Sequence, residues 1–344
     1  MEFIEGQYFR DLLGQPAALR KAAERLTIDA RLESIASELR AGKFKRVVLT
    51  GMGSSFYALY PLFIGLTCAG LPALMLETSE LVGQMKSLLG PHTLIIAVSQ
   101  SGKSVEIVRL IELAGQSKIV SVTNAENSPL WAKSNAGLLI NAGPESSVAC
   151  KTYLNTLLIL IWLEAVFTGV HFAHVQHQLA IAPDCVESYI AQWRRHLATL
   201  NGLLQAVRHV FVVGRGRSLA AAGTGGLIIK EAAHFPAEGL SSAAFRHGPF
   251  ELVSRNVFVL VFAGDAGNAP LNRKLVKDIQ SAGGLAALVD RNTEKGVFCL
   301  PDAPELLRPI MEILPVQMMT LSLASLAGRE AGKFVLASKI TTSE

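Results

Sequence analysis

The chain has 344 residues, of which half are hydrophobic, and its formal net charge is +4. A chain of this length can bury a large core and suggests two domains, while a modest charge without any basic run argues against a nucleic-acid partner. The four cysteines lie far apart and form no Cys-X-X-Cys pair, which disfavours a zinc ribbon or a redox pair and fits a reducing, cytoplasmic compartment.

The N-terminal region predicts a helical segment ahead of the first domain. Its first letters, "MEFIEGQYFRDLLGQ", are acidic and contain no apolar h-region, so no signal peptide is expected. Residues 16–40 show the pattern of an amphipathic helix region. We assign residues 1–35 to this helical segment.

A glycine turn follows the first apolar strand, in "KRVVLTGMGSS" over residues 45–55. A dinucleotide fingerprint would need a third glycine where Phe56 stands, so NAD or FAD is not expected and no organic cofactor is predicted. A Gly-X-Gly turn also suits tight packing of a strand on a helix, with a phosphate or sugar near the strand end.

The stretch 98–104, "VSQSGKS", ends like a nucleotide-binding P-loop but lacks its first glycine. Ala97 stands in that position, inside an apolar strand over residues 94–98. The strand ends in hydroxyls and runs into the helical pattern of "SVEIVRLIELA". A hydroxyl-rich loop before a helix N-terminus favours a phosphate, so we predict an anion site at Ser99, Ser101 and Ser104.

A long apolar segment over residues 153–172 imitates a membrane span. Its apolar part is short and Glu164 interrupts it, so we predict a buried core helix and no membrane partner. His171, His174 and His177 could lie on one side of a helix at its end. No carboxylate or cysteine accompanies them in register, so no metal site is predicted.

The second half of the chain repeats the first at an offset of 163 residues (214 − 51 = 163). Gly51 in "VVLTGMGSS" matches Gly214 in "VFVVGRGRS", and the strand 94–98 matches residues 257–261. Helical stretches separate the strands, which predicts parallel sheets covered by helices. After the second strand the second half carries "FAGDAG", whose acidic Asp265 favours the first half for a phosphate. The predicted fold class is α/β with two tandem domains, at residues 36–170 and 195–330, followed by a C-terminal tail at residues 331–344.

Five motifs in order resemble the double SIS-domain family of sugar-phosphate isomerases and deaminases: "GMGSSFYA", "VSQSGKSVE", "NAGPESSVACKTY", "KEAAHFPAEGLSSAAFRHGP" and "ASKITTSE". This family includes the isomerase half of glucosamine-6-phosphate synthase and related deaminases and deglycases. The resemblance covers nearly the whole chain after about residue 30. It implies two tandem SIS domains, a phosphorylated sugar or amino sugar as ligand, and a homodimer with its site near the subunit boundary.

The resemblance also implies roles for single residues. Glu231 resembles the base that moves a proton between C1 and C2, and His247 the ring-opening residue, which the neighbouring subunit supplies in the synthases. Lys339 resembles the lysine that forms an imine with a keto sugar. A buried glutamate, a histidine and a desolvated lysine suit these tasks chemically. Contacts to the phosphate and the sugar are expected from Ser54, Ser55, Ser99, Gln100, Ser101, Ser104, Val148 and Ala149.

Departures from the family's pattern leave the reaction open. The sequence shows no glutaminase domain and has Glu2 where a synthase carries its cysteine, so free ammonia is expected in place of glutamine. Ile228 replaces a lysine one helical turn before the base, and Ala244 replaces an acidic residue three before the histidine. The loop "CKTY" is one residue shorter than usual, which brings Lys151 near the place of a family lysine. We expect an isomerase or deaminase acting on an amino-sugar 6-phosphate; a fructosyl-amine-phosphate deglycase and a non-catalytic sugar-phosphate sensor stay open.

Overall fold

The computed structural model describes residues 5–169, 172–336 and 339, which form two compact units. Of these residues, the N-terminal sheet unit holds 18–144, 152–169, 172–180 and 339. The C-terminal sheet unit holds 5–17, 145–151 and 181–336. The loop 145–151, which lies inside the predicted domain 36–170, therefore packs with the C-terminal sheet unit.

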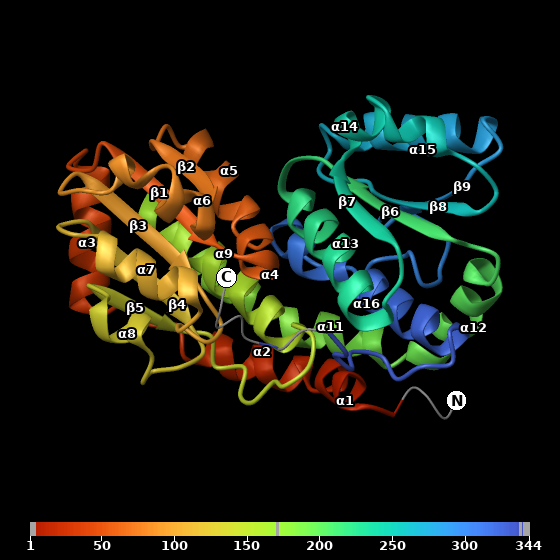
Figure 1. Cartoon of the computed structure of the whole chain (residues 1–344), viewed down its shortest axis with the longest axis horizontal. Helices are drawn as coiled ribbons and strands as arrows, with labels where there is room; N and C mark the ends of the chain where they lie inside the picture. The colour runs from red at the N-terminus through yellow and green to blue at the C-terminus, as the bar shows by residue number, and fades with distance from the viewer. Residues whose placement is uncertain (1–4, 170–171, 337–338, 340–344) are drawn as a thin grey trace. The chain divides into compact units, whose positions relative to one another are not determined.

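The N-terminal sheet unit is built on a five-stranded parallel sheet in the order β2-β1-β3-β4-β5 (Figure 1). All six residues of β3 are buried, because a parallel sheet covered by helices takes strands that are apolar throughout. The register pairs Val48 of β1 with Ile95 of β3 and with Leu74 of β2. The strands are Arg46–Gly51 (β1), Ala73–Glu77 (β2), Thr93–Val98 (β3), Lys118–Thr123 (β4) and Ala136–Leu139 (β5).

Helices α6, α7 and α8 cover one face of this sheet. Their buried side chains, among them Leu81, Leu110 and Leu130, form one apolar cluster with Val48 and Ile95 of the sheet. The helices are Gln15–Glu24 (α2), Ala30–Arg40 (α3), Gly53–Tyr57 (α4), Tyr60–Cys68 (α5), Thr78–Gly83 (α6), Val105–Leu113 (α7), Pro129–Lys133 (α8), Lys151–Thr168 (α9) and Phe172–Leu179 (α10), with a 3-10 turn at Lys86–Leu88 (η1).

The C-terminal sheet unit is built on a four-stranded parallel sheet in the order β7-β6-β8-β9. The strands are His209–Gly214 (β6), Ala237–Ser241 (β7), Val257–Phe262 (β8) and Leu285–Val289 (β9). The helices are Gln7–Leu13 (α1), Ala182–Ile190 (α11), Trp193–Leu204 (α12), Leu219–Ala233 (α13), Ser242–Arg246 (α14), Ala269–Ser281 (α15) and Arg308–Leu326 (α16), with 3-10 turns at Gly216–Ser218 (η2), Pro249–Leu252 (η3) and Glu305–Leu307 (η4).

Helices lie on both faces of this second sheet (Figure 1). Phe245 of α14 and Ile279 of α15 pack with Phe211 of β6 on one face. On the other face a Cβ on Gly225 of α13 would lie 3.0 Å from Val212 and 3.3 Å from Val316 of α16. This glycine lets α13 pass between the sheet and α16.

The two sheets have the same strand order. In chain order, β6, β7, β8 and β9 take the places that β1, β2, β3 and β4 take in the first sheet. The strands that the repeat aligns, residues 94–98 and 257–261, lie in β3 and β8. The prediction of an α/β fold with two tandem parallel-sheet domains is confirmed.

Two helical stretches are long and apolar enough to cross a membrane by length and composition alone, Lys151–Thr168 and Glu305–Leu326. Most residues of each are buried inside the protein, as in the core helices of soluble proteins, which pass the same test. The predicted core helix, 153–172, is buried along α9 as far as Thr168, while residues 170–171 lie outside the described part of the chain.

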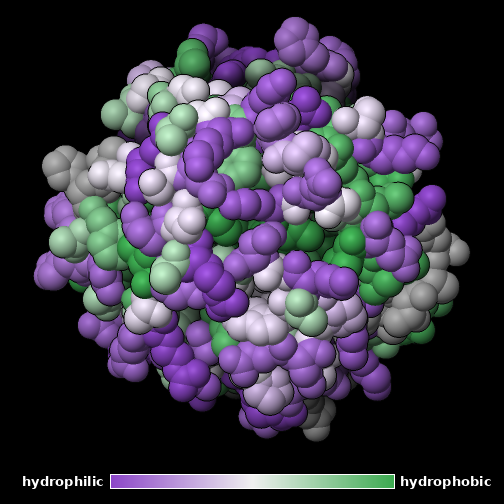
Figure 2. Space-filling view, turned by 90° about the vertical axis from the view of Figure 1, so that its left-hand side faces the viewer, coloured by the Kyte–Doolittle hydropathy of each residue, from purple (hydrophilic) through white to green (hydrophobic). Residues whose placement is uncertain are grey.

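The surface of the protein is mixed in character. Hydrophilic side chains predominate on the face drawn in Figure 2, and hydrophobic ones occupy patches between them. Partly exposed large apolar side chains of the N-terminal sheet unit include Leu74, Met85, Val108 and Leu113. Scattered exposure of this kind is ordinary for folded proteins and by itself indicates no partner.

Candidate functional site

The serine-containing loops of the N-terminal sheet unit follow two neighbouring strands. Ser54 and Ser55 lie in α4, just after β1, and residues 99–104 follow β3. β1 and β3 are adjacent and parallel, and the chain leaves them in opposite directions, toward β2 and toward β4. Ligands of open α/β sheets bind outside the strand ends at such a switch point. The structure places six predicted residues at this one edge: Ser54, Ser55, Ser99, Gln100, Ser101 and Ser104.

Two glycines let these loops approach their neighbours closely. A Cβ on Gly51 would lie 3.0 Å from the Val98 carbonyl oxygen and 3.1 Å from the Phe56 amide nitrogen. Gly102 has a φ of +62°, and a Cβ there would lie 2.3 Å from Ser128 Oγ. The glycines of both sequence motifs are therefore required by space and backbone conformation.

The loop backbone orients the serine hydroxyls. Ser99 Oγ accepts a hydrogen bond from Gly102 N at 3.2 Å, and Ser101 Oγ accepts one from Lys103 N at 3.4 Å. A hydroxyl that accepts in this way keeps its own proton to donate to a ligand oxygen. Ser104 is the N-cap of α7, and within the described part of the chain its side chain makes no capping bond to that helix. The first-turn N–H groups of α7 therefore add donors and positive dipole charge at this edge.

In the C-terminal sheet unit the predicted base, Glu231, is half-buried near the C-terminal end of α13. The helix ends at His234, whose φ of 50° is left-handed. Burial raises the pKa of Tyr8 on α1 well above its ordinary value, and the nearby Cys150, Glu145 and Glu231 raise it further. The buried phenol of Tyr8 therefore lies near Glu231 and near both Glu145 and Cys150 of the loop 145–151.

The loop 145–151 carries the predicted sugar contacts, Val148, which is buried, and Ala149, which is half-buried. The carboxylate of Glu145 closes this loop, because its Oε1 accepts hydrogen bonds from Cys150 N at 3.1 Å and from the Cys150 thiol at 3.4 Å. Burial raises the pKa of Cys150 well above its ordinary value, so the thiol stays protonated and donates. The loop's own side chains therefore fix its shape.

An ion pair anchors the end of this loop. Lys151 Nζ lies 2.7 Å from Asp11 Oδ1 of α1, and the two side chains are 13% and 3% exposed. The sequence had placed Lys151 near a lysine of the family's pattern. In the structure its ammonium pairs with a buried carboxylate, which ties the loop to the N-terminal helix.

Within one chain, the helix that carries Glu231 and the helix that precedes His247 pack on opposite faces of the second sheet. A Cβ on Gly226 would lie 2.2 Å from Gly239 N, so the middle of α13 packs on the middle of β7. Because α13 connects the end of β6 to the start of β7, it runs antiparallel to the strand. Glu231 therefore lies toward the start of β7 on one face of the sheet, whereas α14, which leads to the exposed His247, packs through Phe245 on Phe211 of the other face. The structure does not bring these two residues together within a chain.

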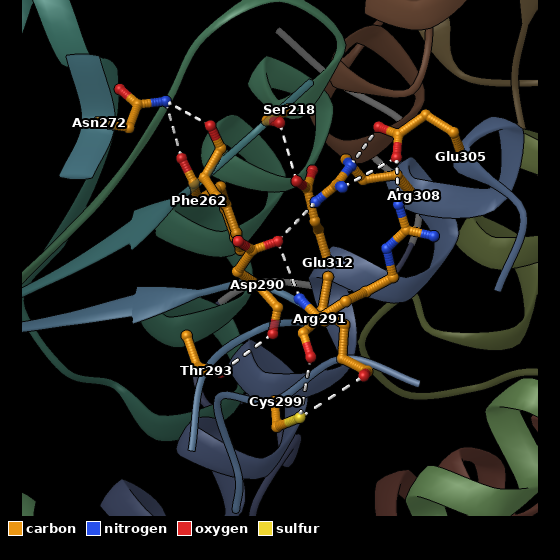
Figure 3. A network of polar contacts seen from close by, with 12 residues as sticks. Ser218, Phe262, Asn272, Asp290, Arg291, Thr293, Cys299, Glu305, Arg308 and Glu312 are labelled. Carbon is orange, nitrogen blue, oxygen red and sulfur yellow. Dashed lines mark hydrogen bonds and ion pairs between the residues drawn. The ribbon is translucent and has the colours of Figure 1, made fainter. Parts of the chain in front are cut away.

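The C-terminal sheet unit has its own switch point, between β6 and β8, and a carboxylate of the chain itself lies beside it (Figure 3). Ser218, which the repeat aligns with Ser55 (218 − 55 = 163), donates its hydroxyl to Glu312 Oε1 of α16 at 2.9 Å. Asp265 in the following loop accepts a hydrogen bond from Asn268 N at 2.9 Å. The Ser218 hydroxyl thus already has an acceptor within the chain, and the acidic Asp265 lies in the loop after β8, which supports the first half as the phosphate site.

Glu312 lies beside a network of ion pairs around Arg308 (Figure 3). Burial raises its pKa from 4.5 to about 8, although Arg308 and the hydrogen bond from Ser218 lower it. Arg308 Nη2 donates to Glu305 Oε2 at 2.9 Å, and its Nη1 lies 3.6 Å from Asp290 Oδ1. Because the effect of burial outweighs those of Arg308 and Ser218, Glu312 is mostly protonated at neutral pH.

The sequence also singled out Lys339, Ile228 and Ala244. Lys339 is half-buried and belongs to the N-terminal sheet unit, whereas the tail residues 337–338 and 340–344 lie outside the described part of the chain. Ile228 is fully buried in α13 and Ala244 is exposed in α14. Both departures from the family's pattern therefore remove a charged group from the neighbourhood of a candidate catalytic residue.

Among the described residues, no group of three or more His, Cys, Asp or Glu side chains is placed to hold a metal ion. Of the three histidines weighed for a metal, His174 shares a hydrogen bond with Gln178, with 2.9 Å between their Nε2 atoms. His171 lies outside the described residues.

These folds and loops belong to one known family. Residues 42–167 and 203–327 each match the SIS domain family, so the chain is a member with two SIS domains. It is 30% identical over 301 residues to glutamine–fructose-6-phosphate aminotransferase (isomerizing) of Pyrococcus horikoshii, a match that covers 83% of this chain and 50% of the relative. The chain spans about half the length of the curated relatives it matches. The predicted resemblance is confirmed.

Solved structures show the same fold. The C-terminal domain of glucosamine-fructose-6-phosphate aminotransferase from Francisella tularensis has a TM-score of 0.84 at 17% identity, over 96% of this chain and 99% of that one. Glucosamine-6-phosphate deaminase from Thermotoga maritima has a TM-score of 0.79 at 18% identity, over 98% of this chain and all of that one (100%). At such identities the two structures show the fold alone.

Sequence reasoning did not find the residues that hold the loop 145–151 in place. Glu145 and Ser147 stand inside the motif "NAGPESSVACKTY", which marked the family, yet only Val148, Ala149 and Lys151 were singled out there. Tyr8 and Asp11 gave no signal, because their partners in the loop lie more than a hundred residues away in the sequence.

Proposed function

We propose that the protein is an aldose–ketose isomerase and deaminase acting on an amino-sugar 6-phosphate, with glucosamine 6-phosphate as the most concrete substrate. The observation that carries the proposal is the pair of serine loops at the β1–β3 switch point, with the first turn of α7 behind them. Membership of the SIS family and similarity to an isomerizing aminotransferase support a phosphorylated sugar as the ligand.

In the proposed reaction, Glu231 removes the proton from C2 of the open-chain amino sugar and returns it to C1, while a proton passes from the amine to O1. The C2–N bond is then an imine. Lys339 adds to C2, ammonia leaves, and water hydrolyses the lysine imine to fructose 6-phosphate. The sum is glucosamine 6-phosphate plus water giving fructose 6-phosphate plus ammonia. His247 opens the ring by moving a proton between the ring oxygen and O1, and no metal or organic cofactor takes part.

The loops would contribute binding energy remote from the reacting carbons. Ser54, Ser55, Ser99, Ser101 and Ser104 would hold the phosphate, and Gln100 with the backbone of Val148 and Ala149 would meet the sugar hydroxyls. Fixing the phosphate in this way orients C1 and C2 before the proton moves.

We also propose that the protein works as a cytoplasmic homodimer. The separation of Glu231 from His247 by the second sheet supports this, because a second copy can supply the histidine that the chain does not bring to its own glutamate.

The test is a time course, followed by NMR, of glucosamine 6-phosphate with the wild type and with Glu231→Gln. Ammonia and fructose 6-phosphate should form in equal amounts with the wild type, and at least about a hundredfold more slowly with the variant. The melting temperature of both proteins serves as the control for folding. A wild type that releases neither product contradicts the proposal.

A second candidate is a sensor that binds a sugar phosphate without turning it over. Ile228 favours it, because this fully buried side chain stands where the resemblance places a lysine next to the base. In the same time course, unchanged substrate that raises the melting temperature points to this candidate. Fructosyl-amine phosphates are then the next substrates to test, since a deglycase would act on them.

A further inference from the structure

Gly332 joins three segments of the C-terminal sheet unit that are far apart in the sequence. It lies six residues after the end of α16, where the chain continues toward Lys339. Its N–H donates to the Ala232 carbonyl of α13 at 2.9 Å. Its carbonyl accepts a hydrogen bond from Ser147 Oγ of the loop 145–151 at 2.6 Å. The C-terminal segment thus bonds to the helix of the candidate base and to the loop of the candidate sugar contacts.

Only a glycine fits at this point. Gly332 has a φ of +76°, and a Cβ there would lie 2.4 Å from Ser147 Oγ and 2.5 Å from Tyr8 Cβ. Ser147 is 5% exposed and Tyr8 is fully buried, so neither can move aside into solvent. One residue further on, His234 Nε2 and the Lys333 carbonyl form a hydrogen bond of 3.1 Å. The segment is therefore held by more than one bond as it leaves α16.

We propose that Ser147 and Gly332 are positioning residues. The hydrogen bonds of Gly332 to Ser147 and to Ala232, which we call the junction, hold the loop 145–151, α13 and the C-terminal segment in fixed relative positions for the reaction. This inference rests on the proposed function. Val148 follows Ser147 directly, and Glu231 precedes Ala232 directly. Through the junction, a shift of any one segment displaces the candidate groups of the other two.

The junction also limits where the candidate imine lysine can act. Lys339 follows Gly332 by seven positions (339 − 332 = 7), and an extended chain spans at most about 3.5 Å per residue. Every position of the Lys339 Cα therefore lies within roughly 25 Å of a fixed point beside Glu231. A plain tail, docked only for stability, would need no such fixed point next to the base.

The chain offers two matched pairs of variants to test the junction. Gly332→Ala is paired with Gly328→Ala, because Gly328 has a similar φ of +65° but no described atom within 4 Å of its Cβ. Both substitutions strain the backbone, and only the first places a methyl group into the junction. Ser147→Ala is paired with Ser146→Ala, since Ser146 is exposed in the same loop.

Two measurements are made on each protein: hydrogen exchange of residues 328–336, and kcat and KM for glucosamine 6-phosphate. We expect Gly332→Ala and Ser147→Ala to speed exchange and to lower kcat about 10- to 100-fold, with KM changed less than about threefold, because misplacement of reacting groups mainly slows the chemical step. Both controls should stay close to the wild type. Faster exchange with unchanged kcat overturns the proposal, and so does unchanged exchange.

If the wild type does not turn the substrate over, exchange in the presence of fructose 6-phosphate decides instead. The junction is upheld, even though the deaminase proposal has failed, if fructose 6-phosphate protects both the loop 145–151 and residues 332–336 in the wild type. In Ser147→Ala, the protection of residues 332–336 should then be lost. Protection of the loop without the segment overturns the junction. If fructose 6-phosphate protects neither, sugar-phosphate binding fails and this inference fails with it.

Discussion

At the scale of single residues, small differences separate two halves that share one strand order. Ser55 and Ser218 hold equivalent places after the first strand of each sheet. In the second half the Ser218 hydroxyl donates a hydrogen bond to the carboxyl of Glu312. The loops around Ser55 present hydroxyls and helix N–H groups that can bind a ligand. The same turn can thus serve a ligand in one half and the core in the other.

This contrast predicts different effects for the two serines. Ser55→Ala should weaken the binding of fructose 6-phosphate about tenfold, because a hydrogen bond to a charged group contributes about 1.5 kcal/mol. Ser218→Ala should leave the affinity unchanged and lower the melting temperature, since Glu312 loses its donor. Calorimetric titration and thermal unfolding of both variants measure the two effects. Equal loss of affinity in both variants contradicts the assignment of the phosphate to the first half.

Glu312 predicts a pH dependence of stability. Its pKa is raised by burial from 4.5 to about 8, so the folded state holds a proton that the unfolded state releases between these values. The contribution of protonated Glu312 to the free energy of unfolding is complete below its pKa in the unfolded state. This contribution is lost as the pH rises through its pKa in the folded state. Glu312→Gln should therefore match the wild type near about pH 5 and be the more stable protein near about pH 9. Urea unfolding at both pH values checks this, and parallel losses in the two proteins would exclude Glu312 as the cause.

At the scale of elements, the sequence predicts what depends on local pattern. The strands after which the serine loops begin could be found, because a parallel sheet makes its strands apolar along their whole length, as in β3. The position of the loop 145–151 could not be predicted from the sequence. Its contacts join Ser147 to Gly332, which are 185 residues apart, and Lys151 to Asp11, and neither pair leaves a periodic signal. His247 could be matched by motif alone, but its separation from Glu231 depends on which faces of the sheet α13 and α14 cover.

The anchoring of this loop predicts a cost in stability. Lys151→Met should lower the free energy of unfolding by about 3 kcal/mol, because it leaves the buried carboxylate of Asp11 without its ion partner. Lys274→Met is the control, since Lys274 is 69% exposed in its pair with Asp278. An exposed pair of this kind contributes less than about 1 kcal/mol. Urea unfolding of the two variants gives the comparison, and similar small losses in both would show that the Asp11–Lys151 pair is not an anchor.

At the scale of the whole molecule, one chain does not bring the candidate base and the candidate ring-opening residue into one place. Glu231 lies on the helix that covers one face of the second sheet, and His247 follows the helix on the other face, so a chain acting alone would have to open the ring without this histidine. The proposed symmetric dimer would resolve this, because two copies related by a twofold axis exchange identical segments across one interface. Each site of that dimer would combine Glu231 of one copy with the histidine of the other.

This arrangement predicts complementation between two inactive variants. Glu231→Gln and His247→Ala should each lose nearly all turnover, yet their mixture, unfolded and refolded together, should regain about a quarter of the wild-type rate. Half of the dimers then carry one chain of each kind, and in each of these one site unites the intact glutamate of one chain with the intact histidine of the other. The second site of the same dimer carries both substitutions and stays inactive.

Turnover per dimer, measured as ammonia release, gives the fraction directly. A mixture as inactive as its components would mean that both residues act within one chain. Wild type refolded with the double variant checks this, because a quarter of the wild-type rate is expected if sites are shared between copies, and half if each chain carries its own site.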